Sequence, residues 1–65
     1  MAGNRPYFEY DQDGQRKTVE ADTWLYEGGV LSFRRYQIVE GGERIEEEVA
    51  SFTDVDPSSI NKVIP

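Results

Sequence analysis

Apolar and polar residues alternate along most of the chain, and pairs of turn-forming residues interrupt the alternation. The pairs are Asp13-Gly14, Gly28-Gly29 and Gly41-Gly42, each between segments rich in aromatic and β-branched residues. Such a pair between alternating segments is the strongest local signal for a β-hairpin. We therefore predict an all-β fold with a four-stranded antiparallel meander, whose strands cover Arg5–Asp11, Arg16–Glu27, Val30–Glu40 and Glu43–Thr53.

If every turn is a two-residue loop, the pairing of residues across the sheet is fixed. Most of the resulting pairs match chemically, but Glu40 faces Glu43 across the last turn. The matching residues form a first apolar row of Phe8, Val19, Ile38 and Ile45, a second of Trp24, Phe33 and Ala50 with Tyr26, Leu31 and Phe52 beside it, and a charge ladder of Arg5, Asp22, Arg35 and Glu48.

The two apolar rows lie on opposite faces of the predicted sheet, because the alternation changes phase near the middle of the last three strands. One solution is a strongly twisted, barrel-like sheet that brings both rows into one core, with bulges near Asp22-Thr23, Arg34-Arg35 and Glu47-Glu48. The other is a homodimer that buries the first apolar row against a second copy and enlarges a small core. We predict the homodimer.

The alternation ends after Thr53. Asp56 and Pro57 are the residue types preferred at a helix N-cap and first helical position. We therefore predict a short helical turn over Ser58–Val63 that packs on the sheet, next to the second apolar row.

The chain has 65 residues, no cysteine, no histidine and a formal net charge of −6. These absences remove disulfides, thiol chemistry, imidazole catalysis and the usual zinc ligands. We expect a single domain over residues 1–65, with no enzyme activity, cofactor or metal. The polar start Met1–Asn4 and the lack of a long apolar run predict no signal peptide or membrane anchor, so we expect a cytoplasmic protein. The acidity makes nucleic acid an unfavourable ligand.

The segment Glu9–Glu20 matches most of an EF-hand calcium loop, with acids at its first, third and fifth positions and glycine at its sixth. An EF-hand needs a helix on each side of the loop. The residues before this loop include Pro6 and alternating aromatics, which are typical of a strand. We therefore interpret Asp13-Gly14 as the turn of a hairpin.

The candidate functional residues lie on the predicted sheet surface. Arg34 lacks a cross-strand acid in the predicted register, and the acidic run at 46–48 offers an interaction surface. We predict a small non-enzymatic protein-binding or regulatory module; the alternative is an acidic nucleic-acid mimic that occupies a basic groove of a partner. The predicted partner-binding residues are Phe8, Val19, Arg34, Tyr36, Ile38, Ile45, Glu46, Glu47 and Glu48.

Overall fold

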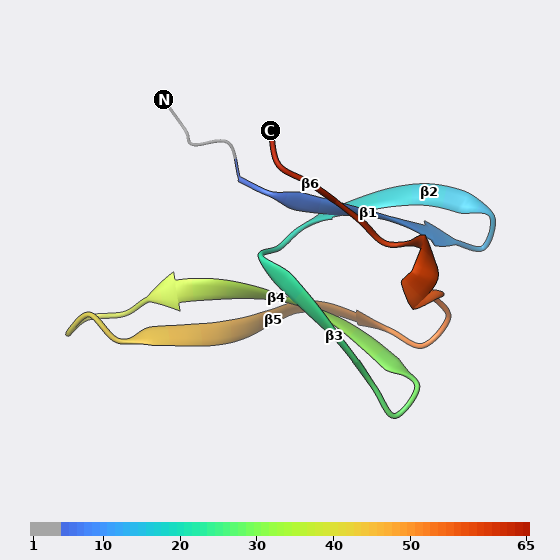
Figure 1. Ribbon diagram of the computed structural model, residues 1–65. Coiled ribbons are helices and arrows are strands. Elements are labelled where there is room, and N and C mark those ends of the chain that lie inside the picture. Colours follow the sequence, from blue (N-terminus) through green and yellow to red (C-terminus); the bar gives the residue numbers. More distant parts are fainter. Residues whose placement is uncertain (1–4) are drawn as a thin grey trace.

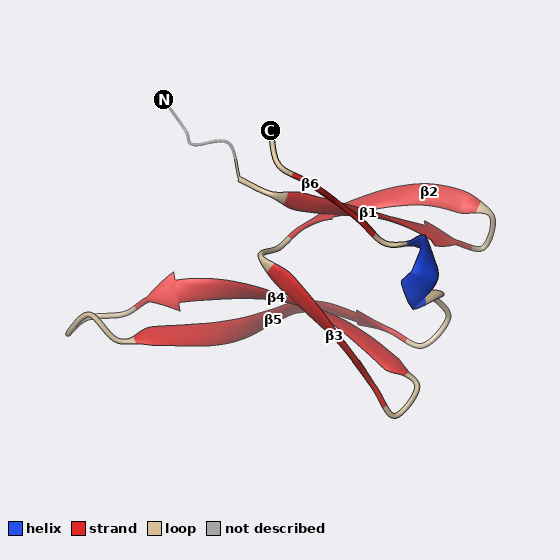
Figure 2. Cartoon of the chain, in the orientation of Figure 1, coloured by secondary structure: helices blue, strands red, loops and turns tan. Residues whose placement is uncertain are grey.

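The computed structural model describes residues 5–65, which consist mostly of antiparallel strands (Figures 1 and 2). The elements are β1 (Tyr7–Gln12), β2 (Gln15–Glu20), β3 (Thr23–Glu27), β4 (Val30–Ile38), β5 (Arg44–Phe52), the 3-10 turn η1 (Pro57–Ser59) and β6 (Asn61–Val63). The strands form two three-stranded sheets, ordered β2-β1-β6 and β3-β4-β5. The all-β prediction is confirmed, whereas the single meander and the barrel-like closure are wrong. The Met1–Asn4 start lies outside the described residues.

A bend at Ala21 and Asp22 divides the predicted second strand into β2 and β3. Ala21 is buried, and the Asp22 N–H donates to the Arg34 carbonyl at 2.8 Å. The chain therefore leaves one sheet at the bend and enters the other. Since β2 and β4 lie in different sheets, the predicted pairing of Val19 with Ile38 does not form.

The hydrophobic core lies where the two sheets pack on each other, between β1 and β4 (Figure 1). Leu31 and Phe33 of β4 are 0% exposed, and Phe8 and Tyr10 of β1 are buried with them. The centroid of the Phe33 ring lies 5.6 Å from that of Phe8 and 5.3 Å from that of Tyr10. At these separations aromatic pairs attract each other beyond the effect of buried area. Residues of both predicted apolar rows thus share one core within one copy of the chain.

Two of the predicted turns have the predicted geometry. β1 pairs with β2 across Asp13-Gly14, and β3 pairs with β4 across Gly28-Gly29, each as a two-residue loop. The four turn residues have positive φ, between 53° and 81°, as a type I′ turn requires. The segment Glu9–Glu20 is therefore a hairpin, as interpreted, and Phe8 lies opposite Val19, as predicted.

The third turn is longer than predicted and shifts the register by one residue. The Val39 N–H donates to the Glu43 carbonyl at 2.8 Å, so the loop consists of Glu40, Gly41 and Gly42. Both glycines have positive φ, 98° and 83°, which residues with a Cβ rarely adopt. The shift takes Glu40 away from its unfavourable position opposite Glu43.

The shifted register ends at a bulge in the middle of β4 and β5. Arg34 lies opposite Glu48, while Phe33 lies opposite Ala50, so Val49 is the extra residue on β5. On the core side of the bulge, from Phe33 and Ala50 to Leu31 and Phe52, the pairing follows the predicted register. The barrel-like alternative placed bulges near Arg34-Arg35 and Glu47-Glu48, and the observed bulge lies beside these positions, but in an open three-stranded sheet.

Beyond the bulge, the first apolar row is not formed. Ile38 lies opposite Arg44, and Ile45 lies opposite Gln37. Residues opposite each other share a face of the sheet, so the two isoleucines lie on opposite faces. The predicted pairing of Ile38 with Ile45 is wrong, because it assumed the shorter loop.

The C-terminal segment forms the turn η1 and then the strand β6. Asp56 caps η1, as predicted: its carboxylate accepts the Ser58 N–H at 2.9 Å, and the hydrogen bonds from Ser58 lower the pKa of Asp56. The helical turn predicted over Ser58–Val63 ends at Ser59, because Asn61–Val63 pairs with β1. We predicted that this segment packs next to the second apolar row, which lies on β3, β4 and β5. The prediction did not include β6, which extends the sheet of β1 and β2.

Candidate functional site

The outer half of the β4–β5 hairpin, residues 34–48, projects from the rest of the protein, and we call it the arm. In Figure 1 it extends to the left, beyond the point where β1 begins. Three large apolar side chains on it are exposed: Tyr36 at 40%, Ile38 at 70% and Ile45 at 42%. These side chains contribute little to the core, so the arm is a candidate contact surface.

The side chains of the arm divide between two faces because successive residues of a strand point to opposite sides of a sheet. We call the face with Tyr36 and Ile38 the outer face. The other face lies on the same side of the sheet as the buried Phe33 and carries Arg35 and Ile45. Together with their cross-strand partners, the residues of the outer face are Arg34, Tyr36, Ile38, Arg44, Glu46 and Glu48.

Contacts between charged and aromatic side chains order the outer face. The Arg34 guanidinium pairs with the Glu46 carboxylate at 2.9 Å. The Arg44 guanidinium carbon lies 4.6 Å from the centre of the Tyr36 ring, a cation–π contact. The prediction that Arg34 lacks a cross-strand acid is therefore wrong, because the shifted register places Glu48 opposite Arg34 and Glu46 close to it.

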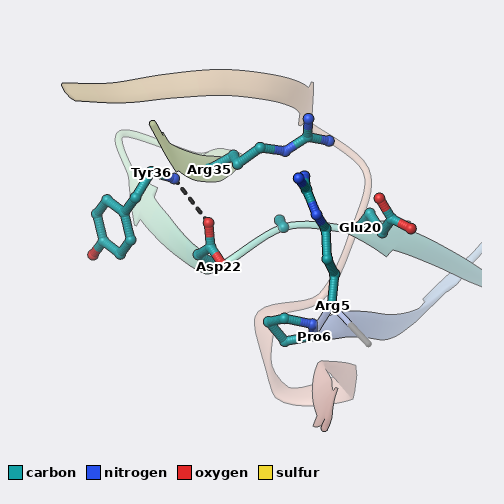
Figure 3. Close-up of a pocket in the computed structure, with 7 residues that line it drawn as sticks. Arg5, Pro6, Glu20, Asp22, Arg35 and Tyr36 are labelled. Carbon is teal, nitrogen blue, oxygen red and sulfur yellow. Dashed lines mark hydrogen bonds between the residues drawn. The ribbon is translucent and has the colours of Figure 1, made fainter. Parts of the chain in front are cut away.

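A pocket of about 170 Å³ lies beside the bend between β2 and β3 (Figure 3). Arg5, Asp22 and Arg35 contribute to its lining, and Figure 3 shows both guanidinium groups extending into the same space. The Asp22 carboxylate accepts the Tyr36 N–H at 2.8 Å and thereby holds the bend against β4. The predicted charge ladder does not form across paired strands, because Glu48 lies opposite Arg34. Its other three members, Arg5, Asp22 and Arg35, line this pocket instead.

The structure brings most of the predicted partner-binding residues together on the arm. Phe8 and Val19 lie elsewhere: Phe8 is buried in the core, and Val19 is partly buried against it. The residues on the arm are Arg34, Tyr36, Ile38, Ile45, Glu46, Glu47 and Glu48.

Two features were missed by the sequence reasoning. The first is the pocket with Arg5 and Arg35, which depends on the bend at 21–22; the change of phase at this position was the signal for it. The second is an exposed apolar group, Leu25, Tyr26 and Val30, next to the Gly28-Gly29 turn.

Comparison of the chain with protein-family models, with curated proteins and with solved structures gave no match. The class of the protein is therefore described by its fold and surface alone. It is a small β protein of two antiparallel sheets with a projecting hairpin. Within residues 5–65, no group of three or more metal-ligating side chains is placed to hold a metal ion. No helix in this part of the chain is long and apolar enough to cross a membrane.

Proposed function

We propose that this protein is a non-enzymatic protein-binding module that acts through the outer face of its arm, and that its partner is a second copy of the chain. The main support for this proposal is that the Ile38 side chain is 70% exposed on a projecting hairpin. Ile38 and the neighbouring Tyr36 stand on one face, where a flat partner surface could cover both. A homodimer remains the favoured assembly, but the arm replaces the first apolar row as its interface.

The charges of the outer face support a partner of the same kind. Arg34 and Arg44 provide two positive charges there, and Glu46 and Glu48 provide two negative ones. An interface with two-fold symmetry joins a patch to its own copy, so the patch must be self-complementary. With two arms antiparallel, Arg44 near one tip can face the glutamates of the other arm. This face is locally neutral, although the whole chain carries a net charge of −6.

The expected affinity is low. Fully burying an isoleucine is worth roughly 1.5–3 kcal/mol, so the Ile38 side chains of two copies supply roughly 3–6 kcal/mol, and Tyr36 adds to it. Association costs at least about 4 kcal/mol in lost translational and rotational freedom. We therefore expect a weak dimer, with a dissociation constant of about 1 mM or higher.

Sedimentation equilibrium from micromolar to millimolar protein tests the proposal. The wild-type mass should rise with concentration, and Ile38→Glu should keep the protein monomeric because it places a charge in the interface. Ile64→Glu is the matched control, since Ile64 is equally accessible, 74% exposed, but lies outside the arm. A wild-type mass that stays monomeric throughout, or an equal effect of the two substitutions, would contradict the arm interface.

The acidic-mimic alternative has less support. Glu46 and Glu47 are adjacent on β5 and point to opposite faces. The Glu46 carboxylate binds Arg34, and that of Glu47 accepts a hydrogen bond from Gln37. Carboxylates that imitate a phosphate backbone would have to stand free along one face, so this arrangement favours the apolar contact.

A further inference from the structure

We propose that the pocket beside the β2–β3 bend binds a small oxyanion, a phosphate or a carboxylate group, between Arg5 and Arg35. This proposal is independent of the arm interface. It depends on two guanidinium groups that reach the same pocket from different elements: Arg5 precedes β1, and Arg35 lies on β4 (Figure 3).

The two guanidinium groups lack ion-pair partners in the described part of the chain. The ion pairs found there join Arg16 to Glu9 and Asp11, and Arg34 to Glu46. Arg5 and Arg35 are in none of them. Two unneutralised positive charges that share a pocket repel each other, and an oxyanion between them removes that repulsion.

Two carboxylates in the neighbourhood of Arg35 accept hydrogen bonds from other donors. Glu47 lies opposite Arg35 on β5, but its carboxylate accepts from the Gln37 side chain. The Asp22 carboxylate accepts the Tyr36 N–H at 2.8 Å. Neither carboxylate forms an ion pair with the Arg35 guanidinium, which extends into the pocket (Figure 3).

The remaining surroundings of the pocket carry charges of both signs. Figure 3 shows the Glu20 carboxylate pointing away from the two guanidinium groups. The Lys62 ammonium donates to the Asp22 carbonyl at 3.1 Å, which adds a third positive charge near the bend. The two arginines of the lining are matched in number by Glu20 and Asp22, and Lys62 by Glu47 opposite Arg35, so the attraction for an anion comes from the two guanidinium groups that extend into the pocket.

Size and donor geometry define the ligand class. A volume of about 170 Å³ is smaller than the roughly 300–1,000 Å³ of pockets that hold drug-sized molecules. It is large enough for one phosphate or carboxylate group with a few waters, each of which occupies about 30 Å³. The planar guanidinium donates two parallel N–H groups, which match the oxygens of a carboxylate or a phosphate.

Titration of the ¹⁵N-labelled protein with inorganic phosphate, and separately with acetate, tests the site at constant ionic strength set with chloride. We expect saturable shifts of the amides of Ala21, Asp22 and Tyr36, with phosphate binding more tightly because its charge is closer to that of two arginines. Tighter acetate binding would identify a carboxylate as the ligand group. Arg35→Gln should weaken binding at least about tenfold, since it removes a charge-assisted contact.

Lys17→Gln is the matched control, because it removes the same charge from β2 at a residue outside the pocket lining. It should bind phosphate as the wild type does. Arg5→Gln is a second pocket variant for the case that Arg35→Gln disturbs the fold, which the dispersion of the amide spectrum reports. Shifts that do not saturate, or that are equal in Arg35→Gln and Lys17→Gln, would reduce the effect to general charge screening and overturn the proposal.

Discussion

Phe33 holds the two sheets together, and its replacement by leucine should weaken the whole fold. Its ring is 0% exposed and lies within 5.3–6.3 Å, between centroids, of the rings of Phe8, Tyr10 and Phe52. Phe8 and Tyr10 belong to one sheet, whereas Phe52 belongs to the other. Leucine keeps an apolar side chain at this point but loses all three aromatic contacts.

The size of the effect follows from these contacts. Each aromatic pair is worth roughly 0.5–1.5 kcal/mol beyond its buried area, so the loss of three pairs in Phe33→Leu should cost about 1.5–4.5 kcal/mol. A chain of 65 residues has a free energy of unfolding of roughly 3–10 kcal/mol, at about 0.05–0.15 kcal/mol per residue. Phe33→Ala, at about 3–5 kcal/mol, would leave a large part of the protein unfolded. Leucine is therefore the informative substitution.

Urea denaturation followed by fluorescence provides the measurement, because the single tryptophan, Trp24, lies opposite Phe33 in the sheet. With a slope of roughly 1 kcal/mol per molar urea for a small protein, the midpoint should fall by more than about 1 M. Ile64→Ala, at an exposed position outside the arm, is the control and should change the free energy of unfolding by less than about 0.5 kcal/mol. Equal midpoints for the two variants would refute the role of Phe33 in joining the sheets.

Two smaller predictions concern the chain's turns. The lowered pKa of Asp56 means that its cap stabilises η1 fully above the usual pKa of 3.8 and loses this effect as the pH falls through the lower, folded-state value. The Ser58 amide signal should report this loss in an NMR titration, and an unchanged signal down to the lowest accessible pH would contradict it. Deleting Glu40 leaves Gly41-Gly42 as a two-residue loop between Val39 and Glu43. The register of the arm should then be preserved, and cross-strand NOEs that still connect Ile38 with Arg44 would verify it.

Local sequence signals predicted the hairpins well. Asp13-Gly14 and Gly28-Gly29 supply the positive φ angles of type I′ turns, so β1–β2 and β3–β4 form in the predicted register. Asp56 was likewise recognisable as a cap from residue type alone. In each case the interactions that decide the structure lie within a few residues of one another.

The errors arose where distant residues decide the structure. The glycines Gly41 and Gly42 are compatible with a two-residue loop and with a longer one. The strand pairing along the arm selects the longer loop. The bend at Ala21 depends on the burial of its side chain between the sheets. A change of phase in the alternation indicated both irregularities, but it does not distinguish a bulge within one sheet from a passage between two. The pocket of Arg5 and Arg35 followed from that passage and could not be predicted without it.

The pairing of β1 with β6 sets the order in which the protein can fold. The Asn61 side chain donates to Glu9 across 52 positions of the chain, whereas each hairpin closes over a few residues. Closing the long loop costs more chain entropy, and the β1–β6 ladder that offsets it spans only three residue pairs. The hairpins should therefore form first and β6 should dock last. Until it docks, the edge of β1 at Tyr7–Glu9 is open to pairing with other chains, so β6 also protects the folding protein against aggregation.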